Sequence, residues 1–314
     1  MTLEAPKTVR TIADLRQVVA AWRRLGLTVA LVPTMGALHR GHLALLRRAG
    51  READRTVVSI FVNPSQFAPN EDLARYPRDE AGDLAKLAAE GCNLVWAPTV
   101  ADIYPDGFAT RIVPGGAALG LESDHRPHFF GAVATVCCKL FNAATPDVAI
   151  FGEKDYQQLC VVRQMVRDLD MTVAILADPT VREADGLAMS SRNAYLSPEE
   201  RAIAPALHGV LKDAATKAAK AVRVTGGAAA TRPKPVPLVP DPRLNGAVPQ
   251  LCALDEICTE AKRALQAAGF TKVDYVAVRE AETLKVVSAR TERPLRVLAA
   301  AWLGATRLID NVPG

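Results

Sequence analysis

Two histidines three positions apart, His39 and His42, lie where a short apolar run meets a helix-favouring segment. Residues 28–32 have the β-branched composition of a buried strand, and residues 43–51 are rich in Leu, Ala and Arg, which favour helix. A helix that starts after a tight turn binds anions, because its first N–H groups and the positive end of its dipole point at the turn. Two imidazoles on one face of that helix start could donate hydrogen bonds to phosphate oxygens.

The turn before this helix contains Gly36 and Gly41, which lack the Cβ that would keep backbone away from a bulky ligand. Taken alone, a histidine pair is more typical of an ordinary strand–loop–helix corner whose two histidines are solvated. The choice between a phosphate site and such a corner therefore depends on the other loops.

A second polar loop holds Asn63 and Gln66, which follow another strand-like run. Their amides donate and accept hydrogen bonds without titrating, and so suit recognition of a hydroxyl or a carboxylate. For Asn63, which precedes a proline, an Asx-turn is the alternative role.

A third loop places Lys154 and Asp155 at a predicted helix start, with Gln158 one turn along. A lysine can meet phosphate as a point charge, and an aspartate there can cap the helix or hold a ribose hydroxyl. Gln158 could equally be an ordinary flanking residue of the helix.

The fourth loop, 179–193, contains Ser190, Ser191 and Arg192 after an Asp-Gly pair. Two hydroxyls and a guanidinium can wrap a polyphosphate, and mobile loops of this type close over a reacting centre. A solvated hinge is the alternative.

Alternating strand-like and helix-like segments predict the elements that carry these loops. Buried parallel strands are expected at 28–33, 56–62, 93–97, 148–151 and 172–177, and helices at 43–51, 79–90, 133–144 and 155–169. This alternation indicates an α/β fold, a doubly wound Rossmann-like parallel sheet. Ligands of such sheets bind beyond the carboxyl ends of the strands, where all four loops fall.

A second, smaller α+β domain is predicted for the rest of the chain. Ser197, Pro198 and Glu200 form a helix-start pattern, and the helix is expected to run to about residue 221. The Pro-, Gly- and Ala-rich stretch 222–250 is interpreted as an insertion or exposed loop. A helix near 255–268 and strands at 273–279, 296–302 and 306–310 follow. The predicted domains are 1–180, binding the substrates, and 181–314, a lid.

Composition bounds the class of protein. The chain has 314 residues, 49% of them hydrophobic and 23% charged, which is ordinary for a globular protein of two domains. The net charge of +4, without a basic stripe interleaved with aromatics, argues against nucleic-acid binding. The six cysteines form no CxxC pair, and neither a signal peptide nor an apolar run of transmembrane length is evident. A cytoplasmic enzyme without membrane contact is expected.

The exact strings resemble the pantothenate synthetase family, within the HxGH nucleotidyltransferase superfamily. They occur in the family's order: PTMGALHRGH at 33–42, FVNPSQF at 61–67, FGEKDYQQL at 151–159, PTVREADGLAMSSRN at 179–193 and AAWLGATRLIDN at 300–311. The resemblance covers nearly the whole chain except 222–250. It implies an ATP-dependent ligase that condenses pantoate with β-alanine through pantoyl adenylate, releasing pyrophosphate and then AMP, and that is a homodimer.

The resemblance also implies roles for individual residues. The catalytic set would be His39, His42, Lys154, Ser190, Ser191 and Arg192. The ATP site would add Met35, Gly36, Ala37, Leu38, Arg40, Gly41, Gly152, Glu153, Asp155, Val181 and Met189. Pantoate would meet Gln66, Gln158, Asn63 and Arg126, and Gln66 would also lie near β-alanine. Mg²⁺ would be held mainly by the ATP phosphates, because no carboxylate cluster with ligand spacing is evident.

The chain departs from the family between Arg126 and Val133. The family usually has Arg-Pro-x-His-Phe-x-Gly-Val, whereas this chain has Arg-Pro-His-Phe-Phe-Gly-Ala-Val. Either Phe129 takes the place of the histidine, or a deletion and an insertion keep His128 in that role. Two other functions stay open: an adenylyltransferase of the same superfamily, which releases a nucleotide conjugate, and an inactive nucleotide sensor in which the altered segment excludes pantoate.

Overall fold

The computed structural model describes residues 6–69, 71–224, 249–287 and 291–314. The chain divides into two compact units, Met1–Tyr195 and Leu196–Gly314. The sequence prediction placed the boundary after residue 180, but 181–195 groups with the first unit. The side chains of this loop explain that grouping, because Ser191 Oγ donates to the carbonyl of Ala37 and Arg192 pairs with Asp72.

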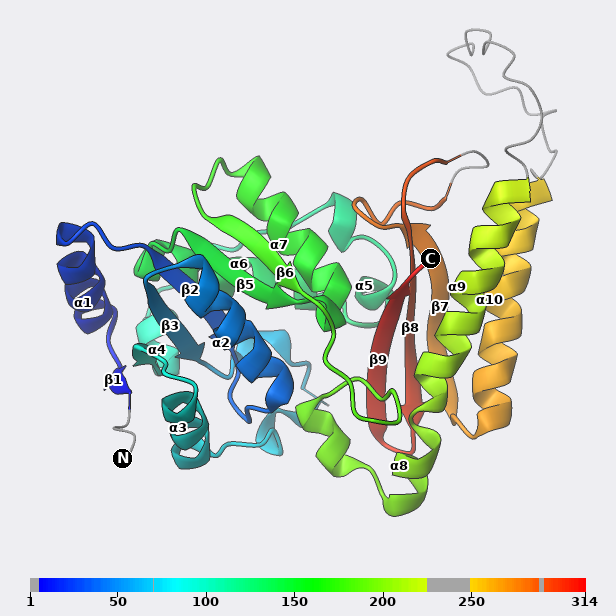
Figure 1. Ribbon diagram of the computed structural model, residues 1–314, viewed down its shortest axis with the longest axis horizontal. Coiled ribbons are helices and arrows are strands. Elements are labelled where there is room, and N and C mark those ends of the chain that lie inside the picture. The colour runs from blue at the N-terminus through cyan, green and yellow to red at the C-terminus, as the bar shows by residue number, and fades with distance from the viewer. Residues whose placement is uncertain (1–5, 70, 225–248, 288–290) are drawn as a thin grey trace, which may run out of the picture. The chain divides into compact units, whose positions relative to one another are not determined.

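The first unit contains a parallel sheet with a helix or a turn after nearly every strand (Figure 1). Its strands are β1 (Lys7–Val9), β2 (Val29–Thr34), β3 (Arg55–Ile60), β4 (Leu94–Trp96), β5 (Val148–Gly152) and β6 (Ala174–Asp178). Its α-helices are α1 (Ile12–Arg24), α2 (Arg40–Glu52), α3 (Glu80–Ala89), α4 (Val100–Ile103), α5 (Glu122–His125), α6 (Phe129–Ala144) and α7 (Tyr156–Asp168). Short 3-10 turns are η1 (Pro64–Gln66), η2 (Asp72–Ala74), η3 (Gly116–Ala118), η4 (Glu153–Asp155) and η5 (Ser191–Tyr195).

The six strands run parallel in the order β1-β4-β3-β2-β5-β6. The chain moves from β2 through β3 to β4, and then returns to place β5 on the other side of β2. The order therefore reverses between β2 and β5, where open α/β sheets bind their ligands. The predicted fold class and the five predicted parallel strands are confirmed, but β6 is not buried as predicted, because it lies at the edge of the sheet. Strand β1 and helix α1 were not predicted. Strand β1 has only three residues and one buried side chain, which is too short a pattern to identify a strand.

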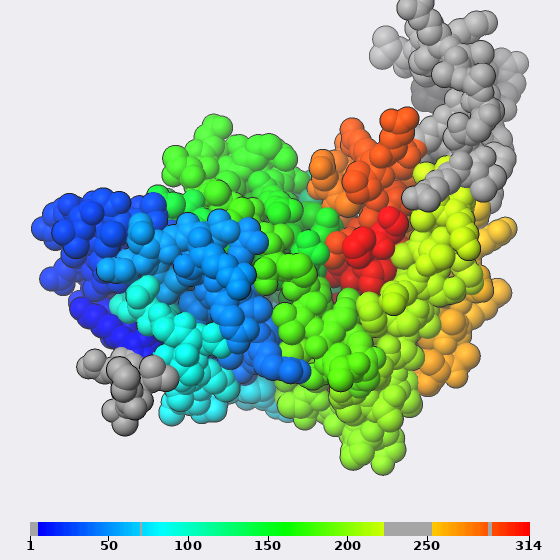
Figure 2. All heavy atoms as spheres, in the orientation of Figure 1, coloured from blue at the N-terminus to red at the C-terminus, as the bar shows by residue number. Residues whose placement is uncertain are grey.

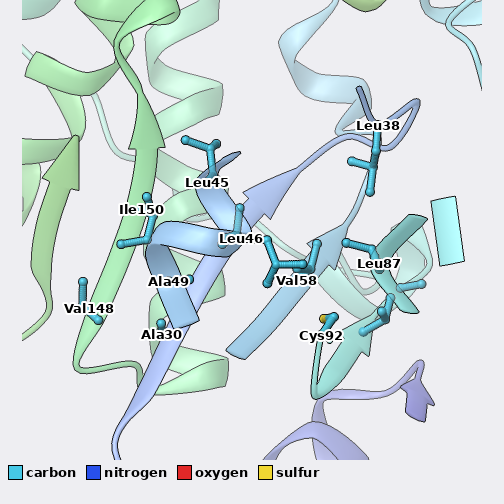
Figure 3. Packing of buried hydrophobic residues seen from close by; sticks show 13 residues of the cluster. Ala30, Leu38, Leu45, Leu46, Ala49, Val58, Leu87, Cys92, Val148 and Ile150 are labelled. Carbon is cyan, nitrogen blue, oxygen red and sulfur yellow. The ribbon is translucent and has the colours of Figure 1, made fainter. Parts of the chain in front are cut away.

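One face of the sheet packs against α2 and α3. Alternate strand residues share that face, as Val32, Val58 and Val95 do through their register. They meet Leu46 and Ala49 of α2 in one buried cluster (Figure 3). In Figure 2 the azure atoms of α2 lie next to the cyan atoms of the α3 region. Helix α6 also contacts β2 but supplies no residue to this cluster, because it lies on the other face of the sheet (Figure 1).

The second unit is a three-stranded antiparallel sheet with helices packed on it. Its elements are α8 (Pro198–Ile203), α9 (Ala206–Val224), α10 (Pro249–Ala268), β7 (Lys272–Glu280), β8 (Leu295–Leu303) and β9 (Thr306–Pro313). The strand order is β7-β8-β9, and α10 contacts β7 while α9 contacts β8 and β9. The three predicted strands are confirmed.

The prediction of one continuous helix from Ser197 to about residue 221 is wrong, because two helices, α8 and α9, occupy this segment. Its start is confirmed, since Ser197 Oγ accepts the N–H of Glu200 at 3.2 Å and a Glu200 oxygen accepts the N–H of Ser197 at 2.9 Å. The helix breaks at Pro205, however, because proline has no N–H to donate and its ring crowds the preceding turn. Most of the predicted insertion lies outside the described residues.

Among the described residues, five cysteines are free thiols, including the adjacent Cys137 and Cys138. Within the same residues, no helix is both long enough and apolar enough to span a bilayer.

Candidate active site

The predicted loops all leave the carboxyl ends of strands in the first unit. The turn before α2 follows β2, η1 follows β3, η4 follows β5, and the 179–193 loop follows β6. The loops after β2 and β5 flank the reversal of strand order. The fold therefore brings the histidine pair and Lys154 to the same point of the sheet edge.

His39 and His42 cap helix α2 reciprocally. His39 Nδ1 accepts the N–H of Gly41 at 3.1 Å, and His42 Nδ1 accepts the N–H of His39 at 3.3 Å. Their ring centroids lie 4.1 Å apart. Because each Nδ1 acts as an acceptor, the proton of each neutral ring sits on Nε2. Neither Nε2 has a hydrogen-bond partner within the described part of the chain, so both N–H groups remain available to a ligand.

Both imidazoles are neutral at physiological pH. Burial, followed by the positive charge of Lys154, lowers the pKa of His39 to about 4. Burial and the adjacent His39 lower the pKa of His42 to about 3. The pair therefore presents two uncharged Nε2–H donors to a ligand.

The two glycines of this turn have partners within the chain. Gly36 adopts φ +78°, and a Cβ there would lie 3.1 Å from Asp83 Oδ2. A Cβ on Gly41 would lie 2.9 Å from the ring of His39. The glycines thus allow the turn to pack on α3 and on the His39 ring, whereas their closeness to a ligand stays a prediction.

Asp83 of α3, which was not predicted as a site residue, fixes this turn. Its buried carboxylate accepts the N–H of Leu38 at 2.8 Å and pairs with Lys86 at 3.4 Å. The neighbouring Ala37 adopts φ +50°, and its carbonyl accepts Ser191 Oγ at 3.2 Å. The turn is therefore tied to α3 and to the 179–193 loop.

Asn63 is a buried structural residue that orients Gln66. Its Oδ1 accepts Ser65 N–H, Ser65 Oγ and Tyr104 OH, as expected of an Asx-turn. Its Nδ2 donates to Gln66 Oε1 at 2.9 Å. The Nε2 of Gln66 has no partner among the described residues, and so remains a donor for a ligand.

Arg126 is held by acidic partners. Its guanidinium donates to both carboxylate oxygens of Glu71 at 2.7 and 2.6 Å, and to Glu122 at 3.3 Å. It also donates to the backbone carbonyl of Gln66 at 2.8 Å, and it lies 4.0 Å from the ring centroid of Phe129. Four hydrogen bonds thus occupy most of the N–H donors of Arg126 and fix it behind Gln66, and its contact with pantoate stays a prediction.

The two neighbouring glutamines of α7 face different surroundings. Gln157 is buried and makes three hydrogen bonds. Its Nε2 donates to the carbonyls of Ala117 and Gly120, and its Oε1 accepts the N–H of Glu122. Gln158 makes no side-chain hydrogen bond with any described residue. Only Gln158 thus has an amide available to a ligand.

The turn η4 carries Glu153, Lys154 and Asp155, after Gly152 at its N-cap position. Lys154 lies 3.8 Å from Asp155, and its positive charge reaches both histidines. Of the two roles suggested for Asp155, the structure does not show the capping of α7, because the side chain makes no capping hydrogen bond and is 45% exposed.

The loop after β6 folds back on itself beside α2. Met189 N–H donates to the carbonyl of Val181 at 3.0 Å, and Arg40, at the start of α2, pairs with Glu183 at 2.9 Å. Within the loop, Ser190 Oγ accepts the N–H of Arg192 at 3.2 Å. The predicted serines and Arg192 are therefore brought next to the histidine turn.

The polar side chains at this point of the sheet edge suit an anionic ligand. Within the described ranges, no three His, Cys, Asp or Glu side chains are grouped as a metal site. Lys154 and the two neutral histidines suit phosphate oxygens instead.

The chain is similar to known proteins over nearly its whole length. The model of the pantoate-beta-alanine ligase family matches residues 7–313. A pantothenate synthetase of Mesorhizobium japonicum is 55% identical over 310 residues, covering 99% of this chain and 98% of that protein. Another, of Caulobacter vibrioides, is 49% identical over 312 residues, covering 99% of each.

Two solved structures share the fold over 98% of this chain and 98% of their own. Pantothenate synthetase from Thermus thermophilus has a TM-score of 0.79 at 44% identity. A pantoate-beta-alanine ligase from Francisella tularensis, complexed with beta-gamma ATP and beta-alanine, has a TM-score of 0.75 at 30% identity.

Proposed function

The chain belongs to the pantoate-beta-alanine ligase family and is an enzyme of pantothenate biosynthesis, and we propose that it works through a pantoyl-adenylate intermediate. A carboxylate oxygen of pantoate attacks the α-phosphorus of ATP, the bond to the β-phosphate breaks, and pyrophosphate leaves. The amine of β-alanine then attacks the acyl carbon, loses a proton and displaces AMP. The Francisella relative solved with an ATP ligand and β-alanine supports this assignment of substrates.

The observation that carries the proposal is the pair of Nε2–H donors at the start of α2. Preorganised donors aimed at phosphate stabilise the charge that develops during transfer, without the cost of reorienting water. His39 and His42 act as neutral hydrogen-bond donors, and Lys154 supplies the positive charge beside them. Ser190, Ser191 and Arg192 complete the phosphate site from the 179–193 loop.

The two available amides, on Gln66 and Gln158, bind pantoate through its hydroxyl and carboxylate groups. Asn63 and Arg126 hold Gln66 in place. Asn63 donates to the side-chain oxygen of Gln66, and Arg126 donates to its backbone carbonyl. Their support of pantoate binding is therefore indirect. β-Alanine enters next to Gln66.

Mg²⁺ enters with ATP, because the described residues offer no grouped carboxylates for it. When bound, it neutralises phosphate charge during adenylation. The protein's part is to hold the phosphates with Lys154 and the histidine donors.

An assay of pyrophosphate release tests this function. The protein with ATP, Mg²⁺ and pantoate should release pyrophosphate, and AMP should appear once β-alanine is added. Release of a nucleotide conjugate instead of AMP would identify an adenylyltransferase. ATP binding without any pyrophosphate release would identify an inactive nucleotide sensor.

A homodimer in the cytoplasm is proposed from family membership alone. Light scattering in solution tests the oligomeric state, and a measured mass equal to that of one chain would contradict the homodimer.

A further inference from the structure

Arg192 is bound side-on by a single carboxylate. Its Nε and Nη2 donate to the two oxygens of Asp72 at 2.9 and 3.0 Å. A guanidinium has five N–H donors, and this contact uses two of them. The other three have no hydrogen-bond partner within the described residues, and the Arg192 side chain is 32% exposed. Asp72 thus holds one edge of the guanidinium and leaves the Nη1 edge open.

Asp72 is itself firmly held. It begins the turn η2, and the N–H of Arg75 donates to its backbone carbonyl at 3.0 Å. The preceding residue, Glu71, forms the bidentate pair with Arg126. Tyr195 OH donates to the carbonyl of Arg75 at 3.1 Å, which is a second tie between this segment and the loop of Arg192. The carboxylate therefore has a defined position from which to orient Arg192.

We propose that Asp72 is a positioning residue for adenylation, which holds Arg192 with its free Nη1 edge toward the phosphates of ATP. This inference rests on the proposed function, and it adds a residue that touches no substrate. The carboxylate acts on the rate because Arg192 meets the charge of the transferring phosphate only in a fixed orientation. Displacing a catalytic group by about 1 Å costs up to about 100-fold in rate.

The test is a double-mutant cycle with Asp72→Asn and Arg192→Ala, measured as pantoate-dependent pyrophosphate release. Asp72→Asn keeps the side-chain volume but removes the charge and one acceptor. We expect kcat to fall about 10- to 100-fold while the KM for ATP changes less than about threefold. In the Arg192→Ala background, the same Asp72 change should have no further effect, because the group that it orients is gone.

Glu90→Gln is the matched control. Glu90 binds Arg47 through the same Nε and Nη2 edge, with the Nε contact at 2.7 Å, and neither residue belongs to the site. The Glu90→Gln variant should leave kcat unchanged. Asp72→Glu is a second variant in case Asp72→Asn folds poorly. It keeps the negative charge but moves the carboxylate oxygens by one methylene, so it tests whether the position of the carboxylate matters. We expect it to lower kcat as well.

The outcomes separate this inference from the proposed function. A wild-type protein without pyrophosphate release would refute the proposed function itself. An active wild type with an Asp72→Asn variant of equal or greater kcat would overturn the positioning role alone. An Asp72→Asn loss that persists undiminished in the Arg192→Ala background would overturn it as well.

Discussion

The two nitrogens of His42 have separate roles, and two substitutions can separate them. Nδ1 caps α2 by accepting the N–H of His39, whereas Nε2–H is the donor proposed for the phosphates of ATP. Asparagine places a polar atom near the position of Nδ1 and has nothing at Nε2, and glutamine does the reverse. His42→Asn therefore keeps the cap and removes the donor, and His42→Gln keeps a donor and removes the cap.

The expected magnitudes differ because the two interactions belong to different states. Losing one preorganised donor costs on the order of 10²–10³ in kcat, or about 2.7–4 kcal/mol of transition-state stabilisation. Losing an N-cap costs about 0.5–2 kcal/mol of folding stability. The capping bond of His42 is long, at 3.3 Å, so we expect the lower end of that range.

Pyrophosphate release and urea unfolding, measured on both variants, test this division of roles. We expect His42→Asn to be slow and as stable as the wild type, and His42→Gln to be faster than His42→Asn but less stable. If His42→Asn releases pyrophosphate at a near-normal rate, His42 is only a capping residue and the phosphate role is refuted.

Three further outcomes are expected. Gln158→Leu should raise the KM for pantoate in steady-state kinetics and leave the KM for ATP unchanged. Gln157→Leu should instead lower the melting temperature, because the buried Gln157 amide makes three hydrogen bonds. The reverse pattern would contradict the assignment. The pKa values of His39 and His42 lie at about 4 and about 3, below the value of about 6.5 expected in the unfolded chain. The stability of the free protein should therefore be highest above about pH 6.5 and should fall progressively as the pH drops toward 3. Ring titrations by NMR with midpoints near 6 would contradict these low pKa values. Replacing 222–250 with a short Gly/Ser link should keep pyrophosphate release, since each doubling of loop length costs only about 0.6 kcal/mol; a folded variant without activity would show that the segment contributes to the site.

The sequence alone determined the fold class and predicted where the candidate site lies. Strand runs, helix starts and polar turns depend on residues a few positions apart, so their pattern is visible without coordinates. The pairing of His39 with His42 is of this kind, because residues three apart at a helix start meet on one face. The resemblance to the family then predicted the roles of Gln66 and Gln158.

Only the tertiary structure decided how those residues are held and which are available to a ligand. Asp83 binds the backbone of Leu38 across 45 positions, a separation over which local pattern predicts no partner. Gln157 and Gln158 are adjacent and chemically identical, but successive helix residues point about 100° apart. One amide is therefore buried in three hydrogen bonds and the other is not, because the path of the chain, rather than residue type, determines which polar groups meet.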